Sequence, residues 1–327
     1  MVRKRYEWGA LSPSQRISYI SAVKCMQNKP PVLPTKHFPG VRSRMDDFAA
    51  THINYTLGVH FNGVFLAWHR HFIWIWERAL RDECGYNGTL PYWDWPLSAN
   101  DLGASPLFDG SPTSLSGNGN PNIQPTNLTE NSAARNINGG CVTSGPFANL
   151  QLTLPDLSDP MYLQSFPSNA FDYTPRCFAR DLNSTRSRRF LNEGVVNSLL
   201  TAPDLRTFQI IMDGGSSPEE LLSNNNVGPH SAGHQCLGPT MADFYGSALD
   251  PAFYLHHGMV DRIWALWQAQ YRATRVSEVY GTQSLFNKAD TPNVTLDTQL
   301  SWGVLGGPRR LEQLMDTHRD EYCYEYV

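Results

Sequence analysis

Histidines are the residues of this 327-residue chain with the clearest potential for chemistry, and there are ten of them. His230 and His234 stand four residues apart, so on a helix their rings lie about 40° apart and can both reach one ion. Neutral imidazole binds copper, zinc, iron and nickel. Such a pair alone is weak support for a metal site. The metalloprotease version is absent, since Ser231 and not a glutamate follows His230.

A sharper feature is the segment 250–262, in which Asp-Pro precedes two adjacent histidines, His256 and His257, and an apolar stretch. Asp-Pro disfavours helix before the turn, so the histidines are expected to open a helix. Asp261 follows His257 by one helical turn. From there a carboxylate can accept a ligand ring N–H and fix its tautomer. Arg262 is expected to be a structural ion-pair partner.

Three more histidines, His52, His60 and His69, lie in the N-terminal part at spacings of eight and nine residues. On one continuous helix, nine residues would turn His69 to the side opposite His60. These two rings can share an ion only if the chain bends between them, and Gly58 and Gly63 supply that freedom. We expect His52 on a helix, His60 in the connecting turn and His69 at the start of the next helix.

Helical periodicity predicts the elements that must position these rings. The expected helices cover residues 12–27, 42–57, 69–84, 187–200, 218–223, 230–235 and 256–271. Between residues 97 and 184 the composition shifts to Gly, Asn, Ser, Pro and Thr, which is typical of long loops. No internal repeat is present. We predict one domain, a helical bundle decorated by long loops.

The composition excludes several classes of protein. Charged residues make up 17% and hydrophobic residues 41%, which argues against disorder and against a coiled coil. The formal net charge is −4 and there is no basic stripe, so nucleic-acid binding is not expected. No apolar run approaches the roughly 18–20 residues of a membrane span. We expect a soluble protein that binds neither nucleic acid nor membrane.

Cysteines and glycosylation motifs point to the secretory route. The six cysteines are an even number without a CxxC pair, and three disulfides are the favoured interpretation, with free buried thiols as the alternative. Five Asn-x-Ser/Thr motifs are present, at Asn54, Asn87, Asn127, Asn183 and Asn293. The first residues lack the apolar core of a signal peptide. The sequence therefore predicts the mature form of a secreted, extracellular glycoprotein.

The histidine segments together resemble a known family. His60-Phe-Asn-Gly-Val-Phe-Leu-Ala-Trp-His-Arg, the pair near residue 230 and Asp-Pro-x-Phe-x-x-His-His-x-x-x-Asp-Arg are similar to the two copper-binding regions of type-3 copper polyphenol oxidases, the tyrosinases and catechol oxidases. The similarity spans both halves of the chain in the same order. It implies a mainly α fold, with a four-helix bundle that holds a dicopper centre, long loops and a few short strands.

The resemblance also implies a ligand set. The implied ligands are His52, His60 and His69 for the first copper, and His230, His234 and His257 for the second. In this family the second histidine of the His-His pair is the ligand, which leaves His256 as a neighbour. Plant and many fungal members place a cysteine two residues before the middle ligand of the first copper. Gly58 stands there, so the crosslink formed by that cysteine is not expected.

The C-terminal residues extend the resemblance. Tyr322-Cys-Tyr324 is similar to the Tyr-x-Tyr motif that closes the family's central domain. This similarity implies that residues 1–327 are a single catalytic domain of a short, fungal-type form, without the C-terminal lid of many fungal members. A disulfide between Cys25 and Cys323, tying the termini together, is the first expectation for the cysteine pairing.

The implied activity is the conversion of o-diphenols (catechols) to o-quinones, with O₂ reduced to water by two coppers that each cycle by one electron. Ser231 follows the first ligand of the second copper, where many members have asparagine, and Phe244 occupies the gate position. Both favour catechol oxidation over monophenol hydroxylation. Phe253 is expected to pack beneath the ligand histidines. The catalytic base is unassigned, because neither Glu219 nor Glu220 can be chosen over a solvated helix start.

Three alternatives stay open at this point. One is a tyrosinase with substantial monophenol hydroxylation. Another is a haemocyanin-like O₂-binding protein with the same ligands, and the last is a zinc or metal-free structural protein whose histidines are core residues. The expected partners are O₂ and small phenols, whereas the physiological phenol and the oligomeric state are left open.

Overall fold

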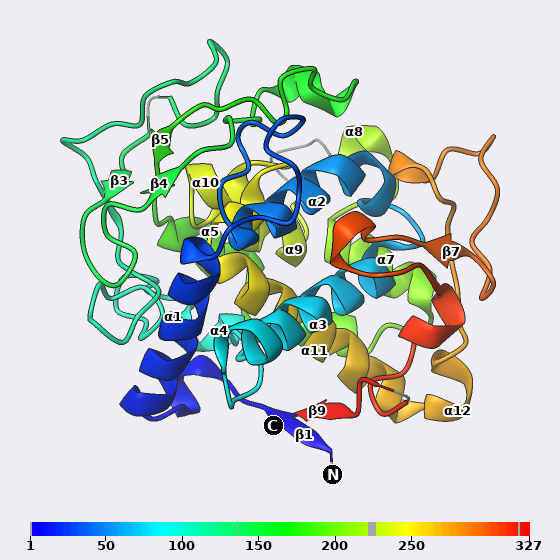
Figure 1. The fold of residues 1–327 in the computed structure, drawn as a ribbon. Helices are drawn as coiled ribbons and strands as arrows, with labels where there is room; N and C mark the ends of the chain where they lie inside the picture. The colour runs from blue at the N-terminus through cyan, green and yellow to red at the C-terminus, as the bar shows by residue number, and fades with distance from the viewer. Residues whose placement is uncertain (1, 136, 222–226, 320) are drawn as a thin grey trace.

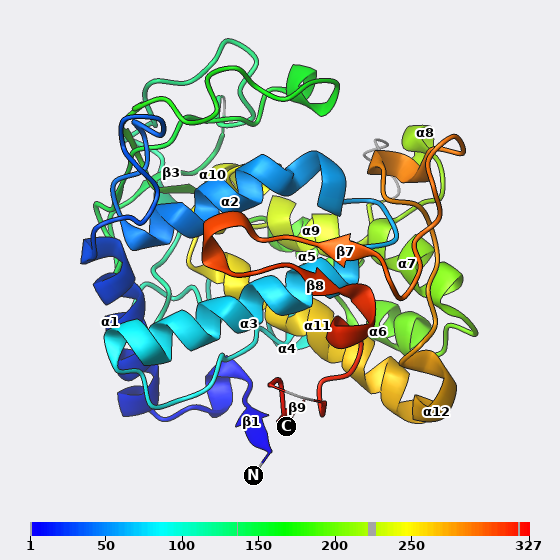
Figure 2. The same cartoon turned by 45° about the vertical axis from the view of Figure 1, so that its right-hand side comes forward.

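Helices form the centre of the molecule, and the other segments wrap around them as long loops (Figure 1). The computed structural model describes residues 2–135, 137–221, 227–319 and 321–327, and the statements below concern these residues. Four central helices are α2 (Arg44–Val59), α3 (Phe65–Cys84), α9 (Pro229–Gln235) and α11 (Ala252–Gln270). The long helices α3 and α11 lie side by side in both views (Figures 1 and 2). The predicted mainly α fold is confirmed.

The other helices lie around this centre. They are α1 (Pro13–Asn28), α4 (Trp95–Ser98), α5 (Ser184–Phe190), α6 (Glu193–Leu200), α7 (Leu205–Asp213), α8 (Pro218–Leu221), α10 (Pro239–Ala242) and α12 (Arg272–Arg275). The predicted helix over 187–200 is two helices, because the chain breaks at Leu191 and Asn192 restarts it as a cap. Helix α7 was not predicted. The end of the predicted 218–223 helix lies outside the described residues.

The strands are short and form small sheets. They are β1 (Arg3–Arg5), β2 (Gly119–Asn120), β3 (Gly140–Val142), β4 (Gln151–Leu152), β5 (Arg176–Cys177), β6 (Ala179–Arg180), β7 (Gln299–Leu300), β8 (Arg309–Arg310) and β9 (Tyr324–Tyr326). β2, β3 and β6 form one antiparallel sheet, β4 pairs with β5, and β7 pairs with β8. Most of them lie in the predicted loop region 97–184, so the few short strands expected are present.

Local sequence signals set the ends of the long helices. Ser12 caps α1 and Ser43 caps α2, and in each case the side chain three residues on returns a hydrogen bond to the cap, which satisfies helix-end N–H groups. Gly85 ends α3 with φ of 66°, a conformation that glycine adopts at little cost. No helix among the described residues is long and apolar enough to cross a membrane.

The disulfides correct two expectations. Cys25 at the end of α1 is bonded to Cys84 at the end of α3, and Cys141 is bonded to Cys177. The described part of the chain contains no third bridge, and Cys236 and Cys323 are free thiols. The expected disulfide Cys25–Cys323 and the expected number of three disulfides are therefore both wrong. The reason is that α1 packs on α3, which brings the Cα atoms of Cys25 and Cys84 to 5.9 Å.

Strand pairing, and not a disulfide, joins the two ends of the described chain. β1 and β9 lie side by side (Figure 1) and run parallel. In their register Arg3 is opposite Tyr324 and Arg5 is opposite Tyr326. The guanidinium of Arg5 is buried and contacts the carboxylates of Glu77 and Asp261. Both ends are therefore attached to α3 and α11, the helices at the centre of the fold.

Candidate metal centre

The first histidine cluster forms where α2 ends and α3 begins. His52 lies within α2, His60 is the residue that ends it, and His69 lies in the second turn of α3. Their candidate ligand nitrogens lie within 4.8 Å of one another. The chain bends between the helices as expected, although α3 starts four residues before His69. The left-handed residue in the bend is Phe61 (φ 50°) and neither glycine, so backbone freedom at Gly58 is not what makes this turn.

Backbone carbonyls orient the first three rings. The Nδ1–H groups of His52, His60 and His69 donate to the carbonyl oxygens of Tyr245, Thr56 and Phe65 at 2.7, 2.8 and 2.9 Å. A carbonyl can only accept, so the proton is on Nδ1 and the lone pair is on Nε2. The Nε2 atoms of His52 and His69 are buried without a hydrogen-bond partner in the structure described. An orphaned buried acceptor of this kind fits a metal ligand.

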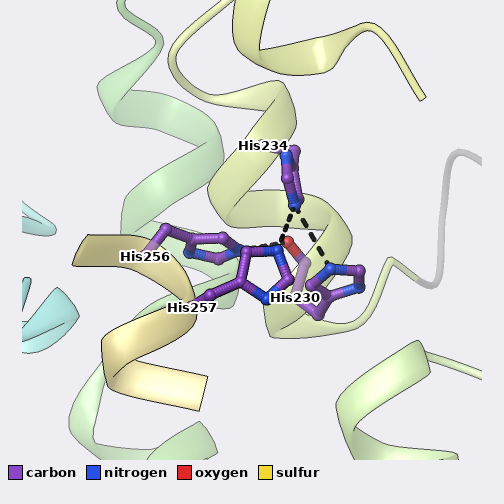
Figure 3. A group of neighbouring side chains, drawn as sticks. All are labelled: His230, His234, His256 and His257. Atoms are coloured by element: carbon purple, nitrogen blue, oxygen red, sulfur yellow. Dashed lines mark hydrogen bonds between the residues drawn. The ribbon is translucent and has the colours of Figure 1, made fainter. Parts of the chain in front are cut away.

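The second cluster joins α9 to α11. Figure 3 shows His230 and His234 projecting from one helix toward His257 on the other. The Nε2 of His234 lies 3.2 Å from that of His230 and 3.3 Å from that of His257. Two nitrogens bound tetrahedrally to one ion at about 2.0–2.1 Å are roughly 3.3 Å apart. The spacing therefore fits three ligands of a single ion.

His256 lies in the same cluster but uses both of its ring nitrogens. The indole N–H of Trp95 donates to its Nδ1 at 3.1 Å, and its Nε2 lies 3.0 Å from the carbonyl oxygen of His230. Because an indole nitrogen can only donate and a carbonyl can only accept, His256 is neutral with its proton on Nε2. This arrangement leaves no lone pair for a metal. His257, by contrast, directs its Nε2 toward the cluster, 3.3 Å from that of His234.

Burial keeps these rings neutral, as metal ligands must be. Desolvation lowers the pKa of His52 to about 4 and that of His234 to about 3. It also lowers the pKa of His60, His69 and His257 well below the usual range, and neighbouring histidines add to the effect. Three neutral imidazoles in each cluster form a donor set that suits copper.

The two clusters face each other closely. The rings of His69 and His257, one from each cluster, stack with centroids 4.5 Å apart and planes at 11°. His60 and His230 are stacked at 6.0 Å and 20°. Two ions held by these rings would be neighbours, as a dinuclear site requires. Phe253 packs against the clusters as predicted, with its ring centroid 4.3 Å from that of His257.

A cavity of about 200 Å³ opens onto both clusters. Its lining residues are His60, Phe61, Leu163, Val227, His230, Ser231, His234, Gln235, Met241, Ala242, Asp243, Phe244 and Ser247. Phe244 packs on the His60 ring at 4.9 Å between centroids. The predicted specificity residues Ser231 and Phe244 therefore both face the space next to the histidines.

The structure corrects the role expected of Asp261. Its carboxylate does not reach a ligand ring. It instead accepts hydrogen bonds from Arg70 at 2.5 Å and from the hydroxyls of Tyr324 and Tyr326 at 2.5 and 2.6 Å. The residue lies one turn after His257 but on the side of α11 that faces the chain ends. Burial alone would raise the pKa of Asp261, yet Arg70 and Arg5 hold it below its usual range.

The other charged residues differ in their position relative to the cavity. Glu219 and Glu220 are exposed at α8, so neither is a base in this cavity. Arg262 lies 3.9 Å from Asp94, as expected of a structural partner. Sequence reasoning missed Asp243, a buried carboxyl that lines the cavity. Burial and the neighbouring Asp156 raise its pKa to about 6.

Comparison with known proteins assigns the fold and the histidine clusters together. Residues 42–270 match the sequence model described as the common central domain of tyrosinase, and this range contains all of the clustered histidines. The chain belongs to the tyrosinase family. Members of this family are dicopper oxidoreductases, and the two clusters fit that cofactor.

Tyrosinase-family relatives cover nearly the whole chain. Tyrosinase P of Aspergillus terreus is 49% identical over 331 residues, which is 99% of this chain and 91% of that protein. N-acetyl-6-hydroxytryptophan oxidase ivoB of Emericella nidulans is 40% identical over 339 residues, 98% of this chain and 91% of the relative. Among solved structures, a mutant polyphenol oxidase from Thermothelomyces thermophila superimposes with a TM-score of 0.87 at 35% identity and covers 100% of this chain and 89% of that one.

The packing of His256 in this tyrosinase-family site makes Gly233 sensitive to substitution. A Cβ at Gly233 would lie 2.1 Å from Cε1 of His256. We expect Gly233→Ala to destabilise the protein by about 1–3 kcal/mol, the usual cost of overpacking, and to loosen copper at the second cluster. Urea unfolding and copper analysis measure these effects.

Gly58→Ala is the matched control for this substitution. Gly58 is also helical, but its added Cβ meets nothing within 4 Å. It is expected to stabilise the protein by about 0.5–1 kcal/mol, because alanine loses less backbone entropy in a helix. Equal urea midpoints for the two variants would contradict the tight packing of α9 on α11.

Proposed function

We propose that this protein is a dicopper oxidase that converts o-diphenols to o-quinones and reduces O₂ to water. The proposed ligands are His52, His60 and His69 for one copper, and His230, His234 and His257 for the other. The observation that carries the proposal is the pair of facing clusters, in which buried neutral rings from opposite sides stack 4.5 Å apart. When bound, the two coppers together would transfer two electrons to O₂, one from each ion.

The chain's own residues supply geometry and a pocket. Backbone carbonyls fix four of the six rings through Nδ1, so each Nε2 points into its cluster. The cavity beside them is apolar at Phe61, Leu163 and Val227 and polar at Ser231 and Gln235. A phenol ring fits such a mixed surface, with its hydroxyls toward the histidines and its edge against the apolar wall.

Catechols are the proposed substrates in preference to monophenols. Phe244 lies on the His60 ring and restricts approach to the cluster, and Ser231 is a weaker acceptor than an amide for orienting a phenol hydroxyl. A second candidate is monophenol hydroxylation. The relative named N-acetyl-6-hydroxytryptophan oxidase favours keeping it, because the compound in that name carries a single ring hydroxyl.

Turnover of a catechol by the copper-loaded protein tests the proposal directly. We expect quinone absorbance to rise with O₂ consumption, and copper analysis to give two ions per chain. Reversible O₂ binding without turnover would favour the haemocyanin-like alternative. Fewer than two coppers after loading, with no quinone, would favour a zinc or structural role for the histidines.

Substitution of the two cavity residues tests the substrate preference. Phe244→Ala removes the ring over His60, and Ser231→Asn adds an amide acceptor. We expect each to raise the ratio of monophenol to catechol initial rates, by roughly the 10–200-fold that a small change in pocket contacts can supply. An unchanged ratio in both variants would contradict the proposed role of these residues.

We also propose that residues 1–327 act as one catalytic domain of a secreted protein. Two disulfides and five exposed sequon asparagines are typical of proteins from an oxidising compartment. Expression through a fungal secretory pathway is expected to give a protein whose electrophoretic mobility shifts on endoglycosidase treatment. No shift would argue against glycosylation at these motifs.

A further inference from the structure

The segment 241–247 contacts ligand rings of both clusters. The carbonyl oxygen of Met241 accepts the Nδ1–H of His234 at 2.9 Å, and that of Tyr245 accepts the Nδ1–H of His52 at 2.7 Å. This segment thus orients one proposed ligand of each copper, and the residue that holds its Tyr245–Gly246 part in place affects the ligand of the first cluster.

Asp243 is that residue, and its side chain is completely buried. One carboxylate oxygen accepts the backbone N–H groups of Tyr245 at 3.0 Å and Gly246 at 2.9 Å, and the other accepts that of Leu157 at 2.9 Å. Arg176 lies 3.8 Å away. Three donors and a nearby guanidinium hold this carboxylate in one position.

The peptide group between Tyr245 and Gly246 links Asp243 to a proposed copper ligand. Its N–H donates to the carboxylate, while its carbonyl oxygen accepts the proton of His52. A carboxylate on the N–H side polarises the peptide and makes its carbonyl a stronger acceptor. A stronger acceptor at Nδ1 makes the opposite Nε2 of the ring a better metal donor.

We propose that Asp243 is a positioning residue that acts through this peptide group to orient His52 and strengthen its Nε2 as a copper ligand. The inference rests on the proposed function, since it takes His52 as a ligand. Sequence spacing assigned the role of orienting a ligand ring to the carboxylate of Asp261, whereas we assign it to the carboxylate of Asp243.

The effect is specific to the first cluster. The Met241 carbonyl that holds His234 belongs to a peptide whose N–H, on Ala242, donates to the carbonyl of Gly238 at 2.7 Å. The acceptor of this peptide N–H is therefore a neutral carbonyl, whereas the corresponding acceptor at the first cluster is the Asp243 carboxylate. Loss of the Asp243 charge should therefore weaken one copper and not the other.

Asp243→Asn in the copper-loaded protein tests this inference, with Asp156→Asn as the matched control. Asp156 is a buried neighbour that accepts a hydrogen bond from the Ser158 hydroxyl, whereas the backbone N–H groups of Tyr245 and Gly246 donate to Asp243 and not to it. Under reducing conditions, transfer of copper to the Cu(I) chelator bicinchoninate is followed by absorbance. We expect one of the two coppers in Asp243→Asn to leave about 10–100-fold faster than in the wild type, with the other unchanged. Asp156→Asn should release both at the wild-type rate.

Several results would overturn the inference. They are wild-type release of both coppers from Asp243→Asn, equal acceleration of both, or the same one-copper effect in Asp156→Asn. If Asp243→Asn does not fold, Gly246→Ala carries the test, because its Cβ would lie 2.7 Å from the Asp243 carboxylate and displace it without removing its charge. The same selective release is expected, and wild-type release would overturn the inference. A wild-type protein that binds fewer than two coppers would instead overturn the proposed function.

Discussion

Replacing His257 with alanine is expected to abolish catechol oxidation and to reduce bound copper from two ions per chain to one. The Nε2 of His257 lies 3.3 Å from that of His234, and its removal leaves the second cluster with two nitrogens. The loss of activity should exceed the roughly 10–100-fold typical of residues that only support a ligand. Copper analysis of the purified variant and quinone formation from a catechol measure both effects.

His256→Gln is the matched control, one residue away on the same helix. An amide side chain can both accept from Trp95 and donate to the His230 carbonyl, which are the two hydrogen bonds that His256 makes. We expect this variant to keep both coppers and to lose less activity than the His257 variant. If it lost one copper as His257→Ala does, the assignment of ligand and neighbour would be reversed.

Asp261→Asn is expected to cause the largest loss of stability, about 3–5 kcal/mol, because it leaves the buried guanidinium of Arg70 without its anion and removes one of the two anions of Arg5. Arg5 and Arg70 both contact this carboxylate, and all three side chains are almost inaccessible to solvent. Urea unfolding with a two-state fit measures the change. A loss below about 1 kcal/mol would contradict the importance of this cluster, since exposed ion pairs already contribute that much.

The exposed pair Arg78–Asp82 supplies the control for this prediction. Its atoms are 3.1 Å apart, but both side chains are more than half exposed, so Asp82→Asn should cost little. Acid should reproduce the effect of Asp261→Asn. Because Arg70 and Arg5 lower the pKa of Asp261 in the fold, its contribution is complete above about pH 4 and is lost as the pH falls further.

The histidine pattern predicted most of the metal centre, because a ligand set requires particular residues at particular spacings. The nine-residue spacing from His60 to His69 required a bend, and the structure has one. Spacing did not show which residue would adopt the strained conformation in it. That residue is Phe61, which lines the cavity, and not Gly58 or Gly63.

The supporting contacts could not be read from spacing, because they connect distant parts of the chain. Asp261 stood one turn from a ligand and was a natural candidate, whereas the carboxylate linked to His52 is Asp243, which reaches it through a peptide group. The disulfide between Cys25 and Cys84 could not be predicted for the same reason, because it also connects distant parts of the chain. Its partners are brought together by the packing of α1 on α3, which periodicity within each helix does not report.

The cluster around Asp261 also bears on when the metal site can mature during synthesis. Arg5 and Tyr326 both bind the carboxylate of Asp261 on α11, the helix that carries His257. These contacts cannot be complete until residue 326 has left the ribosome. Contacts between such distant residues form late, because a long loop must close first. Copper delivery to the second cluster is therefore expected to follow the synthesis of β9, and a copper donor would have to recognise a chain whose β1 and β9 have already paired.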